Sequence, residues 1–203
     1  MMKHSCLVVL LFLCIVFPST RHATAQEATV EPEPAPILGA TYSTTDGHFS
    51  VGFPKNWVLQ SADSDVNKIL IHMSGDFDAL KYFPDRSDKF LSGNIIVSVA
   101  VFERSVLQYP NVTFDNTLDV LSLRKALPDV EPNWEYETLT ALTINNQPAV
   151  QTDVKLADYA DGYDLLIDLG DGLLARVTAY TRPGEVQGFN PLIQAIAASI
   201  THK

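Results

Sequence analysis

Hydrophobic and polar residues alternate along two segments near the C-terminus, which predicts a β-hairpin. The loop between the segments decides which residues face each other. A two-residue Asp171-Gly172 loop would set Ile167 opposite Arg176, whereas a three-residue Gly170-Asp171-Gly172 loop sets Ile167 opposite Ala175. Because only the longer loop keeps the apolar residues on one face, we predict that loop, with a glycine in its left-handed position.

The second face of this hairpin carries Asp164, Asp168 and Arg176, and we interpret it as the solvent-facing side. Arg176 has one acid on each diagonal, within reach of its side chain. Exposed ion pairs of this kind contribute about 0.2–1 kcal/mol each, so we expect Arg176→Ala to be mild. Ala175→Arg should be much worse, because it places a charge in the core beside Ile167.

A helix with an apolar stripe follows the hairpin. The stripe has helical spacing and consists of Phe189, Ile193, Ile196 and Ile200. Asn190 directly precedes Pro191 and is therefore the expected N-cap, with the proline at the first helical position. We predict that the stripe packs on the apolar face of the hairpin.

Strand patterns dominate the rest of the chain. A first hairpin turns at Asp46-Gly47, which sets Tyr42 opposite Val51 and Thr44 opposite Phe49. The further predicted strands are Lys68–Met73, Asn94–Glu103 (the central strand), Trp134–Leu142 and Pro148–Leu156, with a turn at Asn145–Gln147. Helical turns are predicted in Asp76–Phe83, and a second amphipathic helix in Phe114–Leu127. These elements indicate an α+β domain in which helices flank a central antiparallel β-sheet.

The N-terminus has the pattern of a secretory signal peptide over residues 1–25. Lys3 precedes an apolar run from Cys6 to Phe17, and the small-residue site Ala23-Thr24-Ala25 follows. An uncleaved anchor is the alternative, although the run is shorter than the roughly 20 residues that span a bilayer. We expect a secreted or extracytoplasmic protein, in the periplasm or at the cell surface, with no transmembrane segment in the mature chain.

Cleavage after Ala25 would leave 203 − 25 = 178 residues without cysteine, so the mature chain would use no disulfide. Residues 26–38 are rich in Pro and Glu and predict a mobile spacer, with a partner-binding tail as the alternative. Residues 39–203 then form a single domain. Removing the two basic residues of the signal changes the net charge to −10 − 2 = −12, which argues against nucleic acid or anionic lipid as the main partner.

Candidate nucleophilic or zinc chemistry is poorly supported. The mature histidines are His48 beside a turn, His72, and His202 at a C-terminus expected to fray. No nucleophile elbow, His-x-x-x-His pair or Cys-x-x-Cys pair is present. We therefore assign no catalytic residue, no metal ligand and no cofactor.

Two residue sets remain as candidates for binding. Asp158, Asp161 and Asp164 recur at every third position and could hold calcium, but an EF-hand places its ligands at every second residue, so a solvated linker is the favoured interpretation. Four tyrosines could line a ligand groove or stabilise cross-strand pairs: Tyr136, Tyr159, Tyr163 and Tyr180.

The first hairpin and the C-terminal segment together resemble PsbP-like domains. The resemblance rests on Tyr42, Asp46-Gly47, Phe49, Val51, Phe53-Pro54 and Trp57, on the Asn146-Gln147-Pro148-Ala149 turn, and on the ending Tyr180, Pro183-Gly184, Phe189 and Ser199-Ile200. At the turn, Asn146 replaces a glycine, and asparagine also tolerates a left-handed conformation. The resemblance implies a central antiparallel sheet flanked by helices and a non-enzymatic role, but it transfers no functional residue.

The leading hypothesis is an exported, non-catalytic accessory or binding domain that assists a membrane or envelope assembly through a protein partner. One alternative is a small secreted hydrolase that uses carboxylates. Another is a carrier of a small apolar ligand in a groove between sheet and helix.

Overall fold

The structure is a computed structural model that describes residues 38–62, 67–82, 92–107, 134–156 and 160–203. Its strands are β1 Ala40–Ser43, β2 Phe49–Phe53, β3 Val58–Ser61, β4 Asn67–Ser74, β5 Ile95–Glu103, β6 Trp134–Tyr136, β7 Thr140–Ile144, β8 Gln147–Leu156, β9 Ala160–Gly170, β10 Leu173–Thr181 and β11 Thr201–His202. Its helices are α1 Phe77–Tyr82 and α3 Asn190–Ala198, with short 3₁₀ segments η2 Arg104–Leu107 and η3 Val186–Phe189. The predicted helix Phe114–Leu127 and the predicted signal peptide lie outside the described residues.

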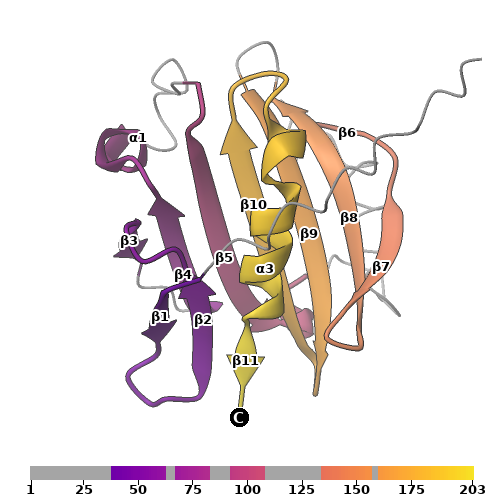
Figure 1. The fold of residues 1–203 in the computed structure, drawn as a ribbon. Helices are drawn as coiled ribbons and strands as arrows, with labels where there is room; N and C mark the ends of the chain where they lie inside the picture. Colours follow the sequence, from indigo (N-terminus) through magenta and orange to yellow (C-terminus); the bar gives the residue numbers. More distant parts are fainter. Residues whose placement is uncertain (1–37, 63–66, 83–91, 108–133, 157–159) are drawn as a thin grey trace, which may run out of the picture. The chain divides into compact units, whose positions relative to one another are not determined.

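The described strands form two antiparallel sheets (Figure 1). The large sheet has the order β3-β4-β5-β10-β9-β8-β6, and β7 also pairs with β8. The small sheet has the order β1-β2-β11. The predicted central strand is confirmed, since β5 lies between β4 and β10, whereas the prediction of a single central sheet missed the small one.

The closing hairpin has the predicted register. Ile167 lies opposite Ala175, and the remaining apolar pairs follow. The loop itself differs from the prediction: the strands extend to Gly170 and Leu173, and a bulge at Leu169 supplies the extra residue. Residues 170–172 all have positive φ, at 84°, 51° and 75°, which two glycines and an aspartate tolerate. A two-residue turn with a bulge therefore gives the same face alignment as the predicted three-residue loop.

The first hairpin also has the predicted register, with Tyr42 opposite Val51. The Thr44 N–H donates to the Phe49 carbonyl at 3.0 Å, and the Gly47 N–H donates to the Thr44 carbonyl at 2.9 Å. The loop is therefore wider than the predicted two-residue Asp46-Gly47 turn.

The C-terminus does not fray as predicted. His202 belongs to β11, which pairs with β2 and places the histidine opposite Phe49. The two rings stack with their centroids 6.4 Å apart. The Lys203 N–H adds a hydrogen bond of 3.0 Å to the His48 carbonyl. These contacts anchor the end of the chain on the first hairpin.

The segment predicted as one strand, Trp134–Leu142, is two strands. Both β6 and β7 pair with β8, so residues 137–139 interrupt the strand. The turn that follows is formed by Asn145 and Asn146, whose φ values are 49° and 65°. This confirms that asparagine replaces glycine there in a left-handed conformation.

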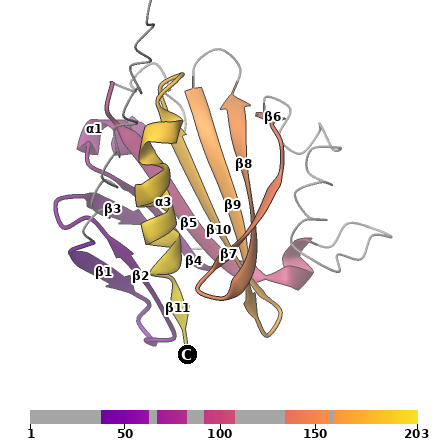
Figure 2. The same cartoon turned by 45° about the vertical axis from the view of Figure 1, so that its right-hand side comes forward.

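Helix α3 packs against the apolar face of the large sheet (Figure 2). Ile193 and Ile196 are fully buried, and Ile200 is nearly so, in one core cluster with the inward residues of β4, β5, β9 and β10. The predicted stripe is confirmed. The predicted cap is wrong, because Asn190 already has helical φ and ψ, and Phe189 is the N-cap without a side-chain hydrogen bond. The helix continues directly from η3, which leaves no extended residue at position 190 for a cap.

Candidate functional site

The acidic segment does not bring its carboxylates together. Asp158 lies outside the described residues. Asp161 and Asp164 are both in β9, three positions apart, so their side chains point to opposite faces of the sheet. Asp161 accepts a hydrogen bond of 2.6 Å from the Gly184 N–H, and Asp164 pairs with Arg176. Within the described ranges no group of three His, Cys, Asp or Glu side chains is arranged to hold a metal ion.

One rung of the large sheet carries polar side chains across six strands. Its members are cross-strand neighbours in the order Gln60, His72, Ser98, Thr178, Asp164 and Thr152. The last four are buried. Apolar clusters lie on either side of the rung, one containing Leu166 and Leu174 and the other containing Val154 and Tyr180. The face that the sequence predicts to be solvent-exposed is therefore buried as well.

An ion pair in this buried face joins Arg176 to Asp164. The Arg176 Nε lies 2.9 Å from Asp164 Oδ1, and its Nη2 lies 2.6 Å from Oδ2. The Asp164 side chain is fully buried, and only 16% of the Arg176 side chain is exposed. Asp168, the other predicted partner of Arg176, pairs with Arg104 instead. Two-point contact and burial make this pair a structural element, in contrast to the predicted weak surface pairs.

The same rung brings His72 and Ser98 together, which the sequence analysis missed. The His72 Nδ1 lies 2.7 Å from the Ser98 hydroxyl. Burial lowers the pKa of His72, which favours the neutral imidazole. A serine beside a neutral histidine is a component of nucleophilic sites, but Ser98 is only 8% exposed. We interpret the pair as part of the buried polar rung.

The candidate tyrosines do not share a groove. Tyr136 and Tyr180 lie in one apolar cluster, whereas Tyr163 faces the other side of the sheet in the main core. Its hydroxyl donates to the Gln151 side chain, and burial raises its pKa to about 12. Tyr159 lies outside the described residues. Tyr136, Tyr163 and Tyr180 thus pack on the two faces of the sheet.

Three carboxylates meet in a small pocket at one end of β8 and β9. Glu137, Asp153 and Asp161 line it together with Lys155 and Gln187. Burial raises the pKa of Asp153, and the charges of Glu137 and Asp161 add to the effect. The cavity holds about 120 Å³. Ligand pockets typically hold roughly 300–1,000 Å³, so this pocket is small by comparison.

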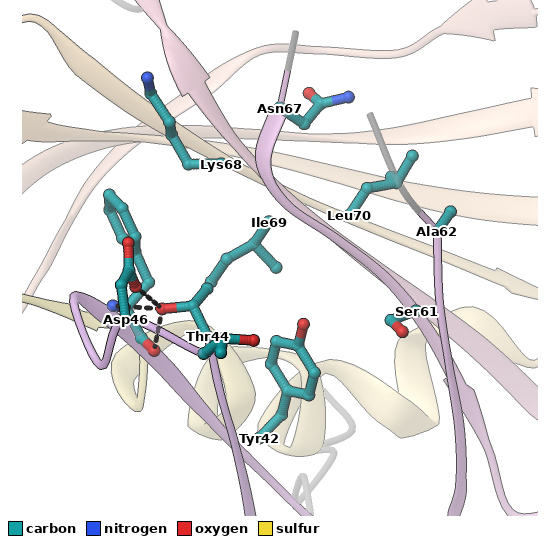
Figure 3. A pocket seen from close by; sticks show the side chains of 11 residues that line it. Tyr42, Thr44, Asp46, Ser61, Ala62, Asn67, Lys68, Ile69 and Leu70 are labelled. Carbon is teal, nitrogen blue, oxygen red and sulfur yellow. Dashed lines mark hydrogen bonds between the residues drawn. The ribbon is translucent and has the colours of Figure 1, made fainter. Parts of the chain in front are cut away.

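A larger groove of about 340 Å³ lies between the first hairpin and strands β3 and β4 (Figure 3). The side chain of Tyr42 stands in its centre, with Thr44 on one side and Ser61 on the other. Further lining comes from Phe49 and from the N-terminal part of β4, residues 67–70. Hydroxyl, amide and aromatic groups thus dominate an open site.

Both charged groups at the groove already have hydrogen-bond or ion-pair partners. The Thr44 hydroxyl and the His48 N–H donate to Asp46 Oδ1 at 2.6 and 3.0 Å, and these bonds lower the pKa of Asp46. Lys68 extends away from Tyr42 and pairs with Glu103 at 3.0 Å. The groove therefore offers neutral hydrogen-bonding groups to an incoming molecule. It contains no reactive pair among its described lining residues.

No signal in the sequence pointed to this groove. Tyr42 belongs to the small sheet and Ser61 to the large one, so their proximity arises from the packing of two sheets. Alternation along a strand predicts its partner in the same hairpin, but it does not predict which sheets approach each other.

No protein-family model matches the chain, and no curated protein matches it in sequence. Solved structures similar in fold were found, among them the following two. The solution structure of cyanobacterial PsbP (CyanoP) from Synechocystis sp. PCC 6803 is 15% identical, with a TM-score of 0.51, covering 85% of this chain and 98% of that one. The Ran-binding protein Mog1p of Saccharomyces cerevisiae is 12% identical, with a TM-score of 0.51, covering 82% of this chain and 96% of that one. The chain therefore has the PsbP-like fold that the resemblance implied, and at these identities the likeness establishes the fold alone.

Proposed function

We propose that this chain is an exported, non-catalytic accessory or binding domain that assists a membrane or envelope assembly through a protein partner. The observation that carries the proposal is the open groove around Tyr42 and Ser61. Its lining offers neutral donors, acceptors and aromatic surface, which is the chemistry of recognition. The two ionised groups beside it are held by their own neighbours.

The fold supports this proposal. One solved protein with this fold is described as Ran-binding, so the same scaffold serves protein recognition elsewhere. Another is a PsbP from a cyanobacterium. Fold alone does not transfer a partner, because sites vary on a common scaffold.

Export is supported by the pattern of residues 1–25, which we propose to be a cleaved signal followed by a spacer over residues 26–38. N-terminal sequencing of the exported protein should begin at Gln26. Recovery of an intact Met1 from membranes would instead support the anchor. None of the helices in the described part of the chain has the length and hydropathy needed to cross a bilayer.

The test is quantitative co-purification. An affinity tag inserted into residues 26–37 leaves the described domain intact, and the protein is then purified from the envelope fraction in mild detergent. We expect one protein to co-purify in near-equimolar amount. Recovery of the chain without any protein partner would contradict the proposal. A lipid detected on that chain by native mass spectrometry would favour the apolar carrier, although Ile193 and Ile196 fill the space between α3 and the sheet.

A further inference from the structure

Strand β3 ends the large sheet, and β4 is the one described strand that pairs with it (Figures 1 and 2). The Ala62 N–H donates to the Leu70 carbonyl at 2.8 Å. Backbone groups alternate in direction along an antiparallel strand, so Gln60 also faces β4, whereas Leu59 and Ser61 direct their N–H and C=O groups outward. Among the described residues no strand pairs with this outer edge.

Most residues of β3 are exposed. Ser61 is exposed, Leu59 is half-buried, and Val58 is 36% exposed. An exposed strand edge is a template for another extended chain unless charges, proline or a bulge block it. Strand β3 has the sequence Val-Leu-Gln-Ser and contains none of these devices.

Each end of β3 has a distinct feature beside it. At the Ser61 end lies the groove around Tyr42. Helix α1 contacts β3 and begins three residues after Ser74, the partner of Val58, and its first residue, Phe77, is 60% exposed. Helix α1 packs through Ala79 and Leu80 on Ile96, a residue in the same rung and on the same face as Val58. The groove and the apolar spot therefore lie on opposite faces of the sheet.

We propose that an extended segment of a partner protein adds to the outer edge of β3 as a further strand. Its main chain pairs with the outward groups of Leu59 and Ser61. One uncharged polar side chain enters the groove beside Tyr42, and one apolar side chain covers Val58 and Phe77 on the other face. Because Val58 and Ser61 are three positions apart, the two side chains of the partner are three positions apart as well. Main-chain pairing combined with alternate side-chain pockets is an established mode of peptide recognition.

The charges of the chain favour this occupant over a second copy. The chain has a net charge of −10, so two copies joined edge to edge would repel each other. A charged side chain in the groove would meet both Asp46 and Lys68, which carry opposite charges and already have partners of their own. An uncharged side chain can instead hydrogen-bond the hydroxyls of Tyr42 and Ser61.

This proposal rests on the proposed function. To test it, random nonapeptides displayed in a library are selected for binding to the purified exported protein. We expect selected sequences to share an uncharged polar residue and an apolar residue three positions apart. Amide hydrogen exchange of the wild-type complex should show new protection at Leu59 and Ser61. Unchanged exchange at both amides would overturn the proposal without any substitution.

Two proline substitutions provide a matched comparison. Ser61→Pro removes an outward N–H that the β4 ladder does not use. Thr41→Pro removes an outward N–H from the edge of β1 with which no described strand pairs. We expect Ser61→Pro to weaken peptide binding at least about tenfold, and Thr41→Pro to change it less than about twofold. Thermal unfolding of both variants verifies the fold.

The results separate the two proposals. If Ser61→Pro binds the peptides as tightly as wild type, or if Thr41→Pro loses as much affinity as Ser61→Pro, the proposal of binding at the β3 edge is overturned. The proposed protein-binding function still holds in that case if a partner co-purifies. Concentration-dependent dimerisation that Ser61→Pro abolishes would assign the edge to a second copy and overturn the partner segment. If no peptide is selected and no protein co-purifies, both proposals fail.

Discussion

The buried ion pair between Arg176 and Asp164 leads to the most specific stability prediction. Arg176→Met keeps most of the side-chain volume but removes the guanidinium, which makes two contacts of 2.9 and 2.6 Å to the Asp164 carboxylate. Asp164 is fully buried, so its charge would lose its counter-ion in a site without direct access to water. Breaking a buried pair in this way costs about 3–5 kcal/mol. This replaces the mild effect that the sequence predicts for Arg176→Ala.

The exposed pair of Lys155 and Glu137 provides the control. Its atoms are 3.1 Å apart, but 58% and 47% of the two side chains are exposed. Lys155→Met should therefore cost far less stability than Arg176→Met. The double variant Arg176→Met with Asp164→Leu should recover most of the loss, because it removes both buried charges together.

Urea denaturation at pH 7 measures the free energy of unfolding of each variant. The reasoning requires the loss in Arg176→Met to exceed that in Lys155→Met clearly. If the two single variants lose similar stability, or if the double variant is no better than Arg176→Met, the pair does not act as a buried unit.

Three further predictions concern the core and two perturbed groups. Ile196→Ala should cost about 2–5 kcal/mol in urea denaturation, because Ile196 is fully buried on the sheet-facing side of α3. A loss below about 1 kcal/mol would show that the helix does not seal the core. Burial lowers the pKa of His72, so on acidification the unfolded chain is protonated at a higher pH than the folded protein. The free energy of unfolding should therefore fall as pH drops below about 6.5. His72→Gln should flatten this decline, and the same dependence of stability on pH in the variant would contradict the prediction. Burial raises the pKa of Asp153, so its charge destabilises the fold at neutral pH. Asp153→Asn, which can still accept a hydrogen bond from the Gln187 side chain, should raise Tm at pH 7, and the gain should shrink as pH falls toward about 4. A lower Tm of this variant at pH 7 would refute the prediction.

The two hairpin registers were predictable from the sequence because alternation identifies one buried face of each strand pair. Ile167 opposite Ala175 and Tyr42 opposite Val51 are both confirmed. The loop details were not predictable to the same level, since a bulge at Leu169 gives the same alignment as a longer loop.

Burial of the second face could not be read from alternation. Its polar residues, such as Ser98, Thr178 and Asp164, lie on three strands and become neighbours only through the order of strands in the sheet. Along each strand they look like the polar half of a solvated pattern. In the folded chain they form one rung, in which paired polar groups tolerate burial.

The small sheet and the groove were missed for a related reason. Strand β11 has two residues, Thr201 and His202, which is too short for any periodic pattern. Its pairing with β2 and the approach of Tyr42 to Ser61 both depend on how the two sheets pack. The candidate site therefore emerged from the structure, whereas the expected fold emerged from the sequence.

The central claim is that a protein partner binds this domain at the groove and the β3 edge. Site-specific photo-crosslinking in living cells tests this claim most directly. A photoreactive amino acid replaces Ser61 in one strain and Asp171, an exposed residue of the closing hairpin loop, in another. The account predicts one crosslinked protein species from position 61 and none of that species from position 171. No crosslink at position 61, or equal capture of the same protein from both positions, would contradict it.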